Sequence, residues 1–229
     1  MAKFSLAQPY RDKAALLGAL LASSLLSVLI FAGRVVYSGH WTYIFLNWNL
    51  FLAWLPLCSA FALWHVDQRK LQIKGLRWLL LLCWLLFFPN SPYLVTDFVH
   101  LTHRQKVPLW YDMMLIFSFA WDGLMLGFIS LWIVQEFIQT HWGKFTSWLI
   151  VGFCLLASGF GIYLGRFLHW NSWDFLLDPH ALLADILTGL RDPLTYPRIL
   201  GVTFLFFSFL TIAYITLTLL VRVRWARVD

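Results

Sequence analysis

Six long runs of uncharged or nearly uncharged residues constrain this chain more than any other feature of its sequence. They cover residues 14–37, 41–64, 76–101, 109–134, 145–168 and 199–221. Each run is long enough, as a helix, to cross roughly 30 Å of hydrocarbon. The chain of 229 residues is 61% hydrophobic and 12% charged, whereas about a quarter of the residues of an ordinary globular domain are charged. We predict an all-α, multi-pass transmembrane helical bundle of about six spans, forming a single domain over residues 1–229.

The positive charges predict how these spans are oriented. Eleven of the 17 Lys and Arg residues lie in flanks on one side of the six runs, and the other six lie on the opposite side. The positive-inside rule then places both termini in the cytoplasm and the chain in the cell (cytoplasmic) membrane, with the lipid bilayer as its partner. The net charge of +6 is spread over several flanks and forms no single basic face, so we predict no nucleic-acid partner.

The third run is interrupted by the sequence Pro89-Asn90-Ser91-Pro92. Proline cannot donate a backbone hydrogen bond, and it disfavours helical geometry at the residue before it. We therefore expect a helix broken at Pro89–Pro92, with non-helical residues before each proline. Because lipid cannot satisfy unpaired backbone groups, the break should face protein or a water-filled cavity.

Small residues recur at helical spacing in the fourth and fifth runs. Gly123 and Gly127 form one pair, and Ala157, Gly161 and Gly165 form a stripe. Small residues allow the backbones of membrane helices to approach closely. We predict that these two helices pack on each other, or that the Gly123/Gly127 or Gly161/Gly165 face forms a homo-oligomer.

A short amphipathic helix is predicted between the fifth and sixth runs. Asp178 and Pro179 are typical of an N-cap followed by the first helical position. The helix should cover about residues 179–190, with one apolar face. That face contains Leu182, Leu183, Ile186, Leu187 and Leu190. We expect the helix to lie flat on the outer membrane surface.

Polar side chains are distributed unevenly with depth in the predicted topology. The inner half contains only Ser, Thr, Cys and aromatic polar groups. The residues of the outer half are Arg34, Asn47, Asn49, Asn90, Asp97, His100, Asp112, Asp122, Arg166 and His169. Charged groups at membrane depth cost a few kcal/mol each and usually face protein or water. We predict that these side chains converge on a pocket open to the outside.

Two of these residues have alternative interpretations. Asp122, near the middle of its run, is either a proton-handling or substrate-binding acid, or a structural residue beside Gly123. Arg166 either binds an anionic headgroup or phosphate through its planar guanidinium, or forms a salt bridge with Asp112 or Asp97. The sequence leaves both choices open.

Asp97, His100 and His103 recur every three residues, so on a helix they lie within reach of one metal ion. The alternative is that these histidines are solvated or hydrogen-bonded at the outer interface. Asp97, His100 and Asp112 are the candidates for general acid–base chemistry. No GxSxG, HExxH or P-loop motif occurs. We predict no cofactor, and whether the protein is an enzyme stays open.

Five short motifs lie between the third run and the loop before the last run. They are Pro89-Asn90-x-Pro92-Tyr93-x-x-Thr96-Asp97, Trp110-Tyr111-Asp112, Trp121-x-Gly123, Gly165-Arg166-Phe167 and Trp170-Asn171-Ser172-Trp173-Asp174. In this combination the chain resembles the bacterial integral-membrane family named domain of unknown function 1361 (DUF1361). The resemblance implies a multi-pass bacterial membrane protein and no established activity, so it transfers no catalytic role. His103 lies outside these motifs.

Residues 170–174 combine aromatic rings with Asn and Asp just beyond the fifth run. Such a segment suits a lid or an access platform for a pocket, and it equally suits an aromatic belt with turn residues. We include it in the predicted binding site, together with the polar residues of the outer half. The predicted binding residues are Asn90, Tyr93, Asp97, Asp112, Asp122, Arg166, Trp170, Asn171, Trp173 and Asp174.

Three functions are compatible with these features. The first is an outward-facing site for a lipid-linked or otherwise amphipathic substrate. The second is a small transporter or channel, because broken helices beside an intramembrane acid are typical of transporters. The third is a membrane assembly or scaffold protein whose polar cluster only packs the helices. A cavity that opens only to the outside would indicate the first function. A path that reaches both faces of the membrane would indicate the second, and a dry cluster with all polar groups paired would indicate the third.

Overall fold

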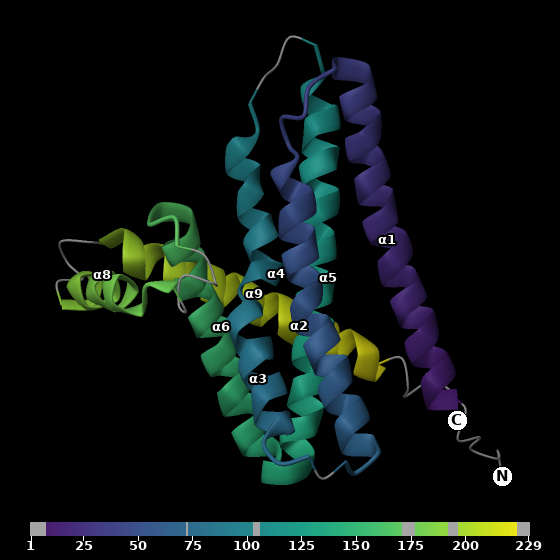
Figure 1. The fold of residues 1–229 in the computed structure, drawn as a ribbon, viewed down its shortest axis with the longest axis vertical. Helices are drawn as coiled ribbons and strands as arrows, with labels where there is room; N and C mark the ends of the chain where they lie inside the picture. The colour runs from purple at the N-terminus through teal and green to yellow at the C-terminus, as the bar shows by residue number, and fades with distance from the viewer. Residues whose placement is uncertain (1–7, 72, 103–105, 171–176, 192–196, 224–229) are drawn as a thin grey trace.

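The computed structural model describes residues 8–71, 73–102, 106–170, 177–191 and 197–223, and Figure 1 shows their arrangement. These residues form helices, and no strand occurs among them. Six helical stretches are long and apolar enough to cross a membrane. The predicted all-α, multi-pass bundle is therefore confirmed. In chain order the elements are α1 (Gln8–Ser38), α2 (Phe45–Gln68), α3 (Leu76–Phe87), α4 (Asn90–Tyr93), the 3-10 helix η1 (Leu94–His100), α5 (Leu109–Trp142), α6 (Lys144–Phe167), α8 (Pro179–Arg191) and α9 (Pro197–Val223).

The first spans run back and forth along the long axis of the molecule. One end of the bundle contains the last residue of α1 and the first residues of α2 and α5 (Figure 1), and we call it the Ser38 end. The opposite end contains the last residues of α2 and α5, and we call it the Gln68 end. The positive-inside rule predicts that the Ser38 end is the outer one, and this orientation stays a prediction.

Helix α5 is the centre of the bundle, because it contacts α1, α2, α4, α6 and η1. In its most apolar 18-residue stretch, 61% of the residues are buried, against 22% for α1 and 11% for the last span. The helix continues to Trp142, well beyond residue 134 where its apolar run ends. It therefore carries Gln135 and Glu136 toward the Gln68 end. The expectation that the inner half of the membrane holds only Ser, Thr, Cys and aromatic polar groups stays a prediction.

Helices α6 and α9 pack against each other, and α9 crosses the bundle obliquely in Figure 1. Helix α8 lies at the side of the bundle. Asp178 caps α8, since the backbone N–H of Ala181 donates to its Oδ1 at 3.1 Å. The predicted short helix thus forms, whereas its position on the membrane surface stays a prediction. The side chains of Leu182 and Leu190 are outside the described part of the structure.

The third span is divided into α3, α4 and η1, with the first division at Pro89 and the second just after Pro92, between Tyr93 and Leu94. Its break faces inward, because Ser91 and Pro92 are buried. The prediction of non-helical geometry before each proline was wrong. Phe88 keeps φ −54° and ψ −42°, and Ser91 lies within α4. The break consists of altered hydrogen bonding: the N–H of Ser91 donates to Phe88 at 3.1 Å, a tighter i to i−3 bond. Proline removes the donors, and the chain forms this tighter bond at the break.

The glycines of α5 lie against this break. A Cβ atom on Gly123 would collide with the carbonyl oxygen of Ser91, and one on Gly127 would lie 2.9 Å from the Cβ of Ser91. Both positions must therefore lack a side chain for α4 to approach α5. Helix α5 therefore packs closely against the broken third span.

The glycines of α6 lie against the other side of the same segment. A Cβ atom on Gly161 would lie 3.0 Å from the Cβ of Pro89, and one on Gly165 would lie 2.9 Å from Cε2 of Tyr93. The prediction that α5 and α6 pack on each other is confirmed. Their glycine stripes do not meet, because residues 89–93 lie between them. Both faces are covered within the chain, and the predicted homo-oligomer remains untested.

The contact between α5 and the break predicts a stability difference between two glycines. Gly123→Ala should lower the free energy of unfolding by roughly 1–3 kcal/mol, because the new methyl group meets a backbone carbonyl that cannot rotate away. Gly152→Ala is the control, since nothing lies within 4 Å of a Cβ at Gly152. Thermal unfolding of both variants in detergent tests the prediction. Equal shifts in the two variants would contradict it.

Candidate functional site

A cavity of about 760 Å³ lies between α2, the broken third span, α6 and α8. One wall is the break itself, through Pro89, Asn90 and Tyr93. Helix α8 contributes Ile186, and the indole N–H of Trp170 donates to Asp185 Oδ2 at 2.9 Å. Residues from the first, middle and last thirds of the chain therefore line one cavity.

The cavity changes in character along the bundle axis. Toward the Gln68 end its walls are apolar. These apolar residues are Leu52, Leu86, Phe153, Ala157 and Phe160. Toward the Ser38 end, polar residues join the aromatic side chains of Phe45 and Trp48. The polar residues are Asn49, Asp97, His100, Arg166 and Trp170. On α6 alone, Phe153 and Arg166 are separated by about 20 Å of helix rise. The cavity thus has one apolar end and one polar end.

Asp97 is the buried centre of the polar end, with a side chain only 1% exposed. Its Oδ1 accepts a hydrogen bond from Nη2 of Arg166 at 2.6 Å, and its Oδ2 accepts one from Nδ2 of Asn49 at 3.0 Å. A buried carboxylate is tolerated when it is both ion-paired and hydrogen-bonded. Asp97 therefore holds residues from α2 and α6 in fixed positions.

Arg166 is the most connected side chain of the cavity. Its Nε and Nη2 donate to Oγ1 of Thr96 at 3.1 and 2.6 Å, and its guanidinium carbon lies 4.6 Å from the centre of the Tyr93 ring. Its Nη1 lies 2.7 Å from Nε2 of His100. Because arginine only donates, this geometry assigns Nε2 as the acceptor and places the proton of a neutral His100 on Nδ1. Of the salt bridges that the sequence allows for Arg166, with Asp112 or with Asp97, the structure contains the one with Asp97.

Asn49 and Thr96 contact the ion pair but were not in the predicted binding set. Thr96 belongs to the Pro89 to Asp97 motif, which could have included it. Asn49 was recognised only as a polar residue of the outer half. Its proximity to Asp97 depends on how α2 is rotated against η1, which the sequence does not specify.

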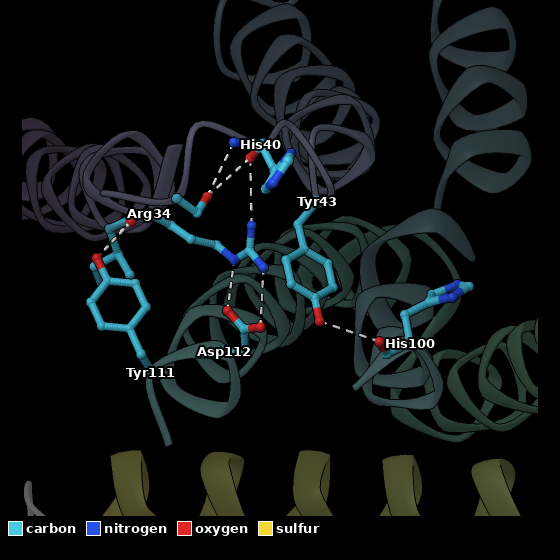
Figure 2. Close-up of polar contacts among 8 residues, drawn as sticks. Arg34, His40, Tyr43, His100, Tyr111 and Asp112 are labelled. Carbon is cyan, nitrogen blue, oxygen red and sulfur yellow. Dashed lines mark hydrogen bonds and ion pairs between the residues drawn. The ribbon is translucent and has the colours of Figure 1, made fainter. Parts of the chain in front are cut away.

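Asp112 lies outside this cavity, in a second polar cluster (Figure 2). Arg34 and Asp112 form a two-pronged ion pair, Nε to Oδ1 at 2.6 Å and Nη2 to Oδ2 at 3.2 Å, and both side chains are 1% exposed. The guanidinium lies 4.6 Å from the centre of the Tyr43 ring. The Tyr43 hydroxyl donates to the carbonyl of His100 at 3.3 Å, which links the two clusters.

The second cluster fastens α1 to α5. Besides the ion pair, the Tyr111 hydroxyl donates to the carbonyl of Ile30 at 2.9 Å (Figure 2). Nη1 of Arg34 reaches the carbonyl of His40 at 3.5 Å, a long contact. Asp112 is thus engaged in packing, and general acid–base chemistry in the cavity would not include it.

Asp122 also lies outside the cavity and faces α1. Its Oδ2 accepts a hydrogen bond from the Ser27 hydroxyl at 2.7 Å, and its Oδ1 accepts one from Ser23. The structure therefore separates the predicted residues: Asn90, Tyr93, Asp97, Arg166 and Trp170 line the cavity, whereas the two acids of α5 do not.

Four of the predicted residues lie outside the described part of the chain. They are His103, Asn171, Trp173 and Asp174. The proposed Asp97, His100 and His103 metal site is therefore untested as a trio. Within the described ranges no group of three or more His, Cys, Asp or Glu residues could hold a metal ion.

A family model described as a protein of unknown function (DUF1361) matches residues 48–214. The chain belongs to the DUF1361 family. Comparisons with curated proteins and with solved structures find no match. The region shared with DUF1361 proteins contains the whole broken span, α5 and α6, and with them most of the cavity wall. Several of the motif residues that resemble this family line the cavity: Pro89, Asn90, Tyr93, Asp97, Gly165, Arg166 and Trp170.

The second cluster predicts a large effect of removing one charge. Arg34→Met should lower the free energy of unfolding by about 3–5 kcal/mol, because it leaves the buried Asp112 without its cation. Thermal unfolding of the detergent-purified protein measures this loss. The double variant Arg34→Met with Asp112→Leu is the control and should recover most of the stability. A double variant as unstable as the single one would argue against the ion pair as the cause.

Proposed function

We propose that this DUF1361 protein binds a lipid-linked or otherwise amphipathic substrate in the cavity beside the broken helix, from the outer side of the membrane. The observation that supports this function best is the division of the cavity into an apolar and a polar end. An amphipathic molecule has the same division. Its orientation in a bilayer, headgroup toward water and chain toward the middle, matches the order of the two ends under the predicted topology.

The size of the cavity suits such a ligand. Its volume of about 760 Å³ lies within the range of roughly 300–1,000 Å³ that is typical of small-molecule sites. Aromatic and aliphatic side chains would contact the chain of the ligand. Burial of such surface is favourable by about 25 cal/mol per Å² relative to water, and the gain relative to lipid is smaller. The apolar end thus accommodates the ligand, and the polar end selects it.

The polar end offers a donor to a headgroup. A guanidinium has five N–H groups, and the contacts to Thr96, Asp97 and His100 use four of those of Arg166. The side chain is 14% exposed, so the fifth group can reach a ligand. Both oxygens of Asp97 already accept hydrogen bonds. We therefore propose binding, with Asp97 as a positioning residue, and no acid–base step.

Filling the apolar end tests the proposed function. Ala157→Trp places an indole in the cavity and should reduce the amphipathic molecules retained by the purified protein by about tenfold, an effect of about 1.4 kcal/mol. Native mass spectrometry of protein released from detergent counts the retained molecules. Leu149→Trp is the matched control, because Leu149 is exposed on the same helix and does not line the cavity. Unchanged retention in Ala157→Trp would exclude this cavity as the site.

The polar end is tested separately. Arg166→Gln should weaken retention of the same molecules by roughly tenfold or more, since a hydrogen bond to a charged group contributes about 1.5–3 kcal/mol. The single variant also leaves Asp97 without its cation, so the double variant Asp97→Asn with Arg166→Gln is measured beside it. The double variant should melt close to wild type and still bind weakly. Restored binding in the double variant would show that Arg166 serves only the fold.

A further inference from the structure

The cavity has a floor, and the floor is the broken third span. Asn90 and Tyr93 of that span line the cavity, whereas Ser91 is buried on its other side. That other side is covered by α5, because a Cβ atom on Gly123 would collide with the carbonyl oxygen of Ser91. Among the described residues, α5 contributes none to the lining of the cavity. The broken span therefore separates the cavity from the centre of the bundle.

The walls of the cavity are α2 and α6. The break lies between these two helices, because α4 contacts both of them. Each wall carries an aromatic side chain that lines the cavity and is also exposed: Trp48 of α2 is 53% exposed and Phe153 of α6 is 61% exposed. In a chain that spans a membrane, such apolar surface contacts lipid chains. With α5 behind the floor, the opening between α2 and α6 faces the lipid.

The opening has the depth of one leaflet. Phe153 at its apolar end and Arg166 at its polar end line the cavity, and they are separated by about 20 Å of rise along α6. Half of the hydrocarbon core of a bilayer measures roughly 15 Å, and the headgroup adds to this length. A lipid of the leaflet at the Ser38 end covers the same interval. Such a lipid can therefore lie in the opening without changing its depth in the membrane.

Helix α8 is attached at the polar end of this opening. The indole N–H of Trp170 donates to Asp185, and Ile186 is the one residue among those described in α8 that lines the cavity. A headgroup at the polar end would contact α8, whereas Phe153 at the apolar end stays exposed. The two ends thus differ in their cover as they differ in polarity.

We propose that the ligand of this cavity is a long-chain lipid of the bilayer itself, which enters sideways between α2 and α6 from the leaflet at the Ser38 end. Its headgroup lies beside Arg166 and Trp170, and its chain passes over Tyr93 and leaves the cavity between Trp48 and Phe153. Under the predicted topology this leaflet is the outer one. The inference rests on the proposed function, to which it adds the source and the path of the ligand.

The experiment uses the full chain in vesicles of phosphatidylcholine, phosphatidylethanolamine and phosphatidylglycerol in equal amounts, with a diazirine in one acyl chain of a fraction of each lipid. Light releases N₂ from the diazirine, and the resulting carbene inserts into a neighbouring C–H bond. Peptide mass spectrometry of the purified protein then locates the adducts. The three headgroups are included because the proposed path depends on the acyl chain.

Wild type should carry adducts at Tyr93, on the floor of the cavity, as well as at Phe117, which is exposed on α5 and lies outside the cavity. Ser91 is the internal control, because it belongs to the same short helix and is buried against α5. It should carry no adduct. Adducts at Phe117 without adducts at Tyr93, or equal labelling of Ser91 and Tyr93, would overturn the proposal.

Occlusion of the cavity shows whether the adducts arise inside it. Ala157→Trp should lower adduct formation at Tyr93 by about tenfold, in parallel with its expected effect on retained molecules. Labelling of Phe117 should not change. Leu149→Trp is again the matched control, since Leu149 is exposed on α6 and does not line the cavity. If Tyr93 is labelled alike in both variants, the chain does not reach it through the cavity, and lateral entry is overturned.

Failure of this inference differs from failure of the proposed function. The same purified wild-type protein is analysed by native mass spectrometry for retained amphipathic molecules. Retained molecules without adducts at Tyr93 would overturn lateral entry and leave the proposed function in place, with a ligand that arrives from water. Absence of both retained molecules and adducts would overturn the two proposals together.

Discussion

Hydrocarbon offers no hydrogen-bond partner, so each polar side chain at membrane depth must find one inside the protein. This requirement explains most of the buried polar contacts of the bundle. Five of them join two different helical elements. The pairs are Arg34 with Asp112, Arg166 with Asp97, Ser27 with Asp122, Trp84 with Ser130 and Gln135 with Tyr214. These polar contacts thus give specific partners to helices that otherwise pack through apolar side chains.

The broken third span depends on the same requirement. Two prolines remove two backbone donors, and the neighbouring groups must be satisfied or shielded. Glycines on α5 and α6 let both helices approach the break from opposite sides, and the Ser91 hydroxyl donates to the carbonyl of Ala53 at 3.1 Å. The break is therefore held on three sides. Its remaining side, with Asn90 and Tyr93, forms the floor of the cavity.

Much of this architecture could be predicted from the sequence, because length, hydropathy and proline act locally. The number of spans, the break at Pro89–Pro92 and the helix capped by Asp178 are of this kind. The composition of the cavity could not be predicted in the same way. Depth in the membrane follows from position in a run, but the direction in which a side chain points depends on how each helix is rotated against its neighbours. Asp112 and Asp122 face α1, whereas Asp97 faces α2 and α6. The last two turns of α5 were missed because the helix continues beyond its apolar run.

Helix α1 illustrates what directional contacts add to a membrane helix. Only 22% of its most apolar stretch is buried, so nonspecific packing would hold it weakly and in many rotations. Its ion pair to Asp112 and its hydroxyl contacts to Asp122 lie on one stripe, at two heights along α5. A slip of one residue would turn α1 by about 100° and shift it by about 1.5 Å, and both contacts would be lost together. The first span consequently packs against α5 in a single register, which is fixed by polar contacts at two positions along the helix.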